Sequence, residues 1–174
     1  EAPHDMRVGI ALELDDRISF FPHARRGRPV VRLALKPSAT HVLAGRISAD
    51  LVQLVLADFG GNQLKSKMLA MPTFDAAQDE FGKAIAGEIQ IFLRENKLQK
   101  SELARIGIAV QGLADSRKGV IPWSPIFHAR NIPVAEPVEA ATGISCILAN
   151  DANMMAEGIA ARDADSPGRV TAVI

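Results

Sequence analysis

Three short β-like runs in close succession constrain the fold of this chain more than any other feature of its sequence. These β-like runs cover residues 41–48, 51–57 and 63–71. Ala49-Asp50 is short enough for a hairpin turn, and the Gly60-Gly61 pair suits a second one. Strands joined by such short connections must pair antiparallel. The sequence therefore predicts a three-stranded antiparallel meander.

The apolar period changes after the meander. From Thr73 to about Asn96, large apolar side chains recur at helical spacing, which predicts an amphipathic helix with Thr73 as its N-cap. Strands and helices then alternate, as parallel βα crossovers require. The fold class we expect is therefore α/β, a meander followed by crossovers. The further expected elements are a strand at 105–110, a helix at 133–142, a strand at 146–149, a helix at 151–161 and a strand that begins at 169.

The first part of the chain has a different character. A basic cluster at 25–29 directly precedes an alternating run at 30–36, and Pro37-Ser38 follows that run. We interpret this segment as a strap that leads into a strand. The whole chain of 174 residues has the length of one domain. The change of character divides it into a linker segment, residues 1–39, and a folded body, residues 40–174.

Composition excludes several classes of partner and site. The 20 basic and 20 acidic residues give a net charge of zero, so no overall field attracts nucleic acid or an anionic membrane. No apolar stretch approaches the roughly 20 residues of a membrane span, so we expect a cytoplasmic protein without a membrane partner. Cys146 is the only cysteine, which excludes an internal disulfide. His4, His23, His41 and His128 have no metal-ligand spacing, so no metal site is expected.

The most informative polar segment is Asn150-Asp151, which stands where a strand ends and a helix begins. Open α/β sheets bind ligands beyond the carboxyl ends of their strands. Asn150 can donate to and accept from a sugar hydroxyl, and Asp151 can act as general base if a phosphoryl donor is present. Gly112, at the end of the preceding strand, gives room for a ligand near the backbone. The alternative is that Asn150 and Asp151 only cap the following helix, which is the commoner role of such residues.

The wider pattern resembles the ROK family of repressors, open reading frames and sugar kinases. Residues 149–158 look like the family signature that begins Asn-Asp-Ala-Asn and ends Ala-Glu, and 106–115 are similar to its strand and glycine turn. Residues 27–33 resemble the strap that joins the DNA-binding head to the sugar lobe in the family's repressors. The other matching segments, in family order, are 119–120, 124–125 and 131–134.

This resemblance implies a ribonuclease-H-like half of the actin-like ATPase superfamily. It makes residues 40–174 the N-terminal subdomain of a sugar lobe whose second lobe is missing here, and residues 1–39 a remnant or linker of a DNA-binding head. The same resemblance implies a homo-oligomer and a sugar ligand. The sugar-binding residues that it implies are Gly112, Ser124, Asn150 and Asp151.

The sequence departs from the kinases of the family in two places. Kinases of this fold need an Asp-Gly-Thr type turn between the first two strands to hold Mg²⁺ and phosphate. Residues 43–50 lack that Asp, Gly45 is the only remnant of a cofactor-binding turn, and Asp50 suits a turn-forming role. In the loop that contains Ser124 and Pro125, Pro125 is followed by Ile126. The kinases usually have at that position an Asn that contacts sugar. We therefore expect no cofactor in this chain; ATP and Mg²⁺ belong only to a kinase alternative.

Three hypotheses remain open at this stage. The leading one is the sugar-binding effector domain of a ROK-type transcriptional regulator, as a partial chain without kinase activity. DNA would be bound only through a head that is incomplete here, since the 26 residues before Gly27 are too few for a winged helix-turn-helix. The alternative is an ATP-dependent sugar kinase of the hexokinase or glucokinase kind, with Asp151 as general base. The third is a non-enzymatic remnant that dimerises. Trp123 has two interpretations, stacking on a sugar face or anchoring its loop.

Overall fold

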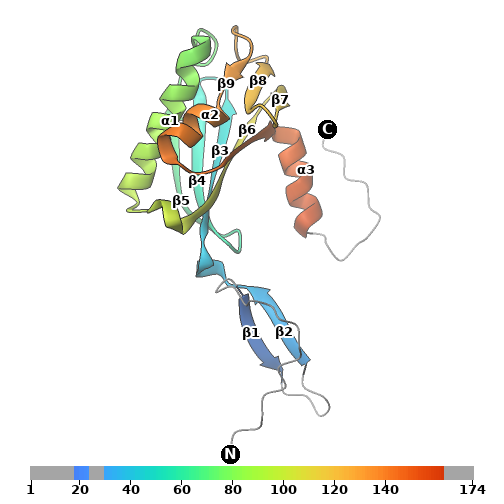
Figure 1. The fold of residues 1–174 in the computed structure, drawn as a ribbon. Coiled ribbons are helices and arrows are strands. Elements are labelled where there is room, and N and C mark those ends of the chain that lie inside the picture. Colours follow the sequence, from blue (N-terminus) through green and yellow to red (C-terminus); the bar gives the residue numbers. More distant parts are fainter. Residues whose placement is uncertain (1–17, 24–29, 163–174) are drawn as a thin grey trace, which may run out of the picture.

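The computed structural model describes residues 18–23 and 30–162 and is built around one mixed sheet (Figure 1). The five strands of this main sheet are β3 (His41–Ser48), β4 (Leu51–Asp58), β5 (Gln63–Ala70), β6 (Leu103–Val110) and β10 (Cys146–Asn150). They lie in the order β10-β6-β3-β4-β5. β3, β4 and β5 pair antiparallel, whereas β6 is parallel to β3 and β10 is parallel to β6. The predicted meander followed by parallel crossovers is confirmed.

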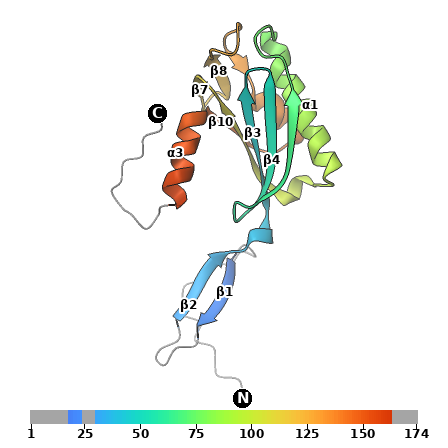
Figure 2. The same ribbon diagram turned by 180° about the vertical axis from the view of Figure 1, so that it is seen from behind.

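Helices cover the two faces of the sheet unequally. α1 (Gln78–Glu95) and α2 (Ala135–Thr142) pack on one face, and both views of the ribbon show α3 (Asp151–Arg162) on the other side of the sheet (Figures 1 and 2). Met154 of α3 fixes that placement, because its methyl carbon lies 3.7 Å from where a Cβ on Gly107 would be. α3 therefore starts at the carboxyl end of β10 and runs back along the face opposite α1.

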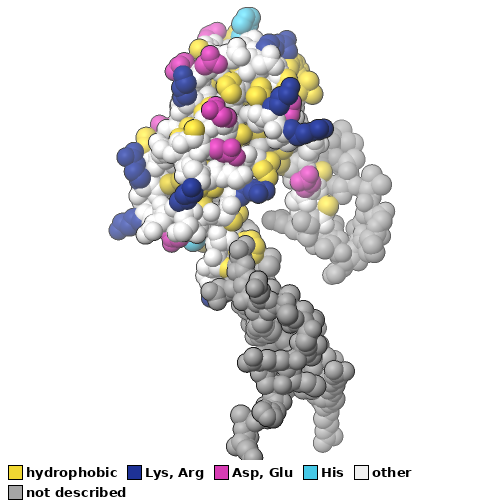
Figure 3. Space-filling view, viewed as in Figure 1, with side chains coloured by type: hydrophobic (Ala, Val, Ile, Leu, Met, Phe, Trp, Pro, Cys, Tyr) yellow, Lys and Arg dark blue, Asp and Glu magenta, His cyan; other side chains and the backbone are white. Residues whose placement is uncertain are grey.

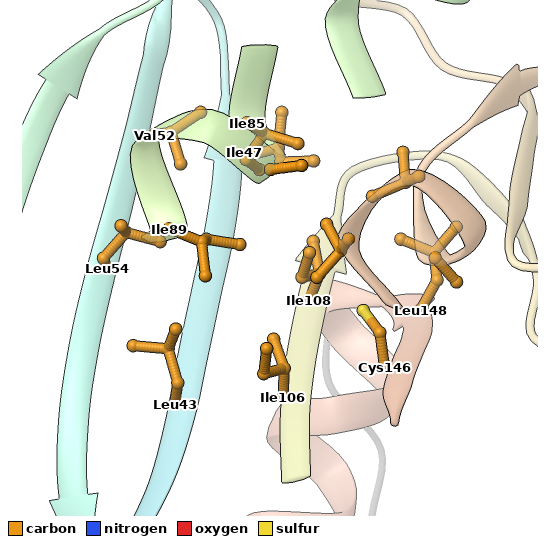
Figure 4. Packing of buried hydrophobic residues seen from close by; sticks show 14 of the residues in the cluster. Leu43, Ile47, Val52, Leu54, Ile85, Ile89, Ile106, Ile108, Cys146 and Leu148 are labelled. Carbon is orange, nitrogen blue, oxygen red and sulfur yellow. The ribbon is translucent and has the colours of Figure 1, made fainter. Parts of the chain in front are cut away.

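The core lies between α1 and the sheet. Strand residues alternate between the faces, so the side that faces α1 carries the buried aliphatic side chains. Figure 4 shows Ile85 and Ile89 of α1 beside the side chains of these strands. Each fully buried aliphatic side chain contributes about 1.5–3 kcal/mol. The strand residues labelled there are Leu43, Ile47, Val52, Leu54, Ile106, Ile108, Cys146 and Leu148.

The start of α1 differs from the prediction. The helix begins at Gln78 rather than after Thr73, so Thr73 as N-cap was wrong. Thr73 is instead buried against the β3–β4 turn, where its N–H donates to Asp50 Oδ1 at 2.9 Å and its hydroxyl accepts from the Asp50 N–H at 3.2 Å. Asp50 has a φ of 53°, which a short turn demands. The turn-forming interpretation of Asp50 is confirmed, and this tertiary contact outweighs local capping.

A second, smaller sheet was not predicted. β7 (Leu113–Asp115), β8 (Val120–Trp123) and β9 (Ile132–Pro133) pair antiparallel in the region that the sequence indicated as a loop. Its first turn is built by Asp115, whose carboxylate accepts the N–H groups of Arg117 and Lys118. Strands of two to four residues are too short to show a period of two, which explains why the sequence did not reveal them.

The strand predicted after the basic cluster is present, and it forms a hairpin with an earlier strand. β1 (Ile18–His23) pairs antiparallel with β2 (Val30–Leu35), and both views show this pair apart from the main sheet (Figures 1 and 2). The short 3₁₀ helix Pro37–Ala39 ends it, as predicted from Pro37-Ser38. The basic cluster at 25–29 and the strand predicted from 169 lie outside the described residues. Among the helices that are described, none is long and apolar enough to cross a membrane.

Candidate functional site

The carboxyl ends of β6 and β10 bring the predicted polar residues together. The two strands are parallel, and Asn150, the last residue of β10, pairs in register with Val110, the last residue of β6. Gly112 lies two residues after Val110, and its carbonyl oxygen accepts a hydrogen bond of 2.7 Å from Nδ2 of Asn150. The expected meeting of Asn150 and Gly112 at one edge of the sheet is confirmed.

The Asn150 amide has two structural partners. Besides donating to Gly112, it accepts the N–H of Asn153 on Oδ1 at 3.1 Å, which caps the first turn of α3. The capping role weighed from the sequence is therefore present. A primary amide offers two N–H donors and two lone pairs, so one donor and one acceptor position remain for another molecule. Asn150 is partly buried and still reaches solvent.

Asp151 begins α3 and meets a cation that the sequence did not indicate. Its Oδ1 accepts the N–H of Ala152 at 3.0 Å, and its Oδ2 lies 3.9 Å from Nη2 of Arg46. The Asp151 side chain is 23% exposed and that of Arg46 is 60% exposed. Arg46 comes from β3, where its neighbours Gly45 and Ile47 face the core, so Arg46 faces the α3 side. A charged residue inside a central strand was the signal that could have found it.

Gly112 is required for a close approach within the protein. Its φ is +108°, and a Cβ there would lie 2.7 Å from the carbonyl oxygen of Trp123 and 2.8 Å from Cα of Ser124. Only glycine tolerates both conditions. The sequence predicted that a ligand approaches this glycine, and the structure shows that the backbone of the small sheet does so. A ligand contact at Gly112 stays a prediction.

Two other predicted residues lie away from solvent. Ser124 is 1% exposed, and its hydroxyl accepts the N–H of Ile126 at 3.4 Å, so it shapes its own loop. Gly45 is buried in the middle of β3, and a Cβ there would meet Ile108 at 3.4 Å. It therefore lies in the strand rather than in the turn to β4. The roles of Ser124 in sugar binding and of Gly45 in cofactor binding stay predictions.

An aromatic and an aliphatic side chain are exposed next to the Gly112 contact. Leu113 and Trp123 are cross-strand partners in the small sheet, and they are 61% and 39% exposed. The guanidinium carbon of Arg130 lies 5.8 Å from the centre of the Trp123 ring, within the range of a cation–π contact. The small sheet thus presents an apolar pair with a cation beside it.

Two hollows formed by described residues are lined by residues other than Asn150 and Asp151. One of about 270 Å³ lies where the ends of α1 and α2 approach Lys100, and one of about 520 Å³ lies beside the β7–β8 turn. The polar pair lies at the carboxyl edge of the sheet, where β10 ends and α3 begins. No cluster of three His, Cys, Asp or Glu side chains suited to a metal ion occurs within the described ranges.

Cys146 is a core residue on β10. It is 8% exposed, and burial together with the negative charge of Glu139 raises the pKa of its thiol to about 12. The thiol is therefore protonated at neutral pH, and a nucleophilic or metal-binding role is disfavoured. Cys146 is thus a small side chain of the core.

The fold and the polar strand ends define a ribonuclease-H-like half of the actin-like ATPase superfamily. The profile of the ROK family matches residues 46–171, and the chain belongs to that family. The DNA-binding transcriptional repressor Mlc of Escherichia coli (strain K12) is 28% identical over 131 residues, which are 72% of this chain and 31% of the repressor. The chain thus spans about a third of the length of this curated relative.

Solved structures of regulators and kinases resemble this chain. A ROK family transcriptional regulator, a homologue of the E. coli Mlc protein, has a TM-score of 0.64 at 25% identity, over 77% of this chain and 34% of its own. A ROK hexokinase from Thermus thermophilus has a TM-score of 0.58 at 24% identity, over 70% and 38%. A glucokinase from Streptomyces griseus, in complex with glucose and AMPPNP, has a TM-score of 0.57 at 19% identity, over 73% and 38%. The last two show the shared fold alone.

Proposed function

We propose that residues 40–174 form part of the sugar-binding effector domain of a ROK-type transcriptional regulator. The observation that carries this proposal is the position of Asn150 and Asp151 at the open carboxyl edge of the sheet, with the Asn150 amide held against Gly112. The spare donor and acceptor of that amide suit one sugar hydroxyl, and the Asp151 carboxylate accepts from a second. The similarity to regulators supports the choice of class.

Two features in and next to the β3–β4 turn weigh against a kinase. A phosphate cradle between the first two strands needs an accessible turn, whereas Asp50 in that turn is bonded to Thr73 and Gly45 is buried in the strand. These contacts leave no acidic side chain of the β3–β4 turn directed to Mg²⁺ or phosphate.

The remaining partners follow from this class. We place the protein in the cytoplasm, as a homo-oligomer whose DNA contacts come from a head outside the described residues. On the face in Figure 3, basic and acidic side chains are interspersed rather than gathered, as the zero net charge leads one to expect. A body with no net charge does not attract DNA electrostatically, so a separate DNA-binding head would have to provide the contacts to DNA.

The experiment is titration calorimetry of the whole chain against hexoses, N-acetylhexosamines and their phosphates. The wild type is expected to bind at least one of them, and Asn150→Ala is expected to lose that binding. Asn150→Asp keeps an oxygen for capping α3 but, like Asn150→Ala, removes the bond to the Gly112 carbonyl, so circular dichroism checks that both variants remain folded. The matched control is Asn96→Ala, which removes a similar amide-to-carbonyl bond, Asn96 Nδ2 to Phe92 O at 2.8 Å, far from the site.

Two results would oppose the proposal. Absence of heat with every sugar, in a chain that circular dichroism shows to be folded, would remove the sugar-binding role. Hexose-dependent ATP turnover that disappears in Asp151→Ala would instead establish the kinase alternative.

A further inference from the structure

Leu113 and Trp123 form an exposed apolar pair near the candidate site. In the small sheet these two residues are 61% and 39% exposed, although Ile121, two residues before Trp123, is only 1% exposed. The apolar side chains at this end of the small sheet are therefore not covered by described residues. Large exposed apolar groups rimmed by polar ones mark binding sites.

The pair is tied to the Asn150 amide through the backbone. Asn150 donates to the carbonyl oxygen of Gly112, the residue directly before Leu113. Gly112 in turn packs against the carbonyl of Trp123, which would lie 2.7 Å from a Cβ. Asn150, the residue predicted to bind the sugar, is thus connected to both apolar residues through Gly112.

The aromatic ring is also held in place. Arg130 lies 5.8 Å from the ring centre, and the loop that carries it is anchored to α1, because Gln78 donates to the Asn131 carbonyl at 3.2 Å and Phe127 packs edge-on against Phe81 at 4.8 Å. Cation–π contact stabilises one orientation of an indole. A preordered ring loses little entropy when a ligand stacks on it.

We propose that Leu113 and Trp123 form a shelf that binds the nonpolar face of a pyranose ring whose hydroxyls are held by Asn150. This inference rests on the proposed sugar-binding function and adds to it the side chains that contact the face of the sugar ring. The C–H groups on one face of a pyranose are apolar, while its edge carries hydroxyls, so the ring needs both an aromatic surface and an amide. The shelf is far too small for a protein partner, because a stable interface takes about 20–30 residues a side.

The chain provides its own reporter for the test. Trp123 is the only tryptophan and the sequence contains no tyrosine, so tryptophan fluorescence reports on the shelf alone. Titration of the whole chain with D-glucose, D-galactose and N-acetyl-D-glucosamine is followed by fluorescence and, in parallel, by calorimetry. The pyranose that binds is expected to shift the emission to shorter wavelength and to reduce acrylamide quenching about twofold or more, since stacking excludes water from the ring.

Variants then assign the effect. Trp123→Ala is expected to weaken the binding of that pyranose roughly tenfold. Trp123→Phe is expected to weaken it less, because a phenyl ring retains a stacking face. Phe74→Ala is the control, since Phe74 is also an exposed aromatic side chain, at 56%, and lies outside the shelf. Calorimetric binding with no change in fluorescence and with unaltered affinity in Trp123→Ala would overturn the shelf and leave the sugar-binding proposal intact. No calorimetric binding of any sugar would overturn both.

Discussion

The guanidinium of Arg46 lies 3.9 Å from the carboxylate of Asp151, so a cation from the central strand of the main sheet reaches the first residue of α3. The two residues are separated by the whole of β6, since β3 and β10 both pair with it. This ion pair connects the meander half of the sheet to the crossover half at the edge where the candidate site lies.

Replacing Arg46 should change the site more than the stability. A partly exposed ion pair contributes about 0–1 kcal/mol, so Arg46→Gln is expected to lower the free energy of unfolding by no more than about 1 kcal/mol. The difference from wild type should shrink in about 1 M salt, which screens exposed charges. Urea denaturation measures both quantities. Arg105→Gln, an exposed arginine on β6, is the control, and a loss above about 2 kcal/mol would mean that Arg46 does more than bridge.

Gly112 should tolerate no side chain. Gly112→Ala combines a φ of +108° with a Cβ placed 2.7 Å from a backbone oxygen, so we expect a loss of roughly 2–4 kcal/mol in the free energy of unfolding. Gly61→Ala is the matched control, because Gly61 has a φ of +84° with nothing within 4 Å of the added Cβ. That variant should lose only about 1–2 kcal/mol, the cost of the left-handed backbone alone. Equal losses in thermal or urea denaturation would show that the close contact is unimportant.

Two glycines of α1 should respond in opposite directions. A Cβ on Gly82 would lie 2.1 Å from the carbonyl oxygen of Pro133, whereas a Cβ on Gly87 meets nothing within 4 Å. Gly87→Ala should therefore raise the free energy of unfolding by up to about 1 kcal/mol, because alanine favours the helix. Gly82→Ala should lower it by about 1–3 kcal/mol, because the helix must move away from the segment before α2. Urea midpoints that shift in the same direction for both variants would contradict this packing.

The Cys146 thiol should make stability fall at alkaline pH. Burial and Glu139 raise its pKa to about 12 in the folded protein, whereas an unfolded thiol has a pKa of about 8.5. The folded state therefore favours the protonated thiol, and the unfolded chain gains stability by losing that proton as pH rises above about 8.5. Cys146→Ala should lose less stability than wild type between about pH 8 and 10.

Thiol labelling gives an independent check. In the folded chain Cys146 should react with a thiol reagent at about pH 8 far more slowly than in urea, because the reactive thiolate is scarce and the side chain is buried. Rapid labelling of the native chain would place Cys146 outside the core.

The sequence predicted the main sheet because each of its strands carries enough residues to show a pattern and short connections fixed the pairing. It also placed Asn150 beside Gly112, because parallel strands end at one edge. The interaction of Thr73 with Asp50 joins residues 23 apart, and no local pattern distinguishes it from a helix cap. Arg46 escaped notice for a similar reason, because its partner in α3 follows from sheet order, which sequence spacing alone leaves open.

The double engagement of Asn150 has a mechanical consequence. Its Nδ2 donates to the carbonyl oxygen of Gly112, just before the small sheet. Its Oδ1 accepts the N–H of Asn153 in the first turn of α3. A molecule that binds the remaining donor and acceptor positions of this amide therefore contacts a side chain that is already bonded to the residue before β7 and to the first turn of α3. A single side chain thus connects the residue that precedes the small sheet to the helix that follows β10.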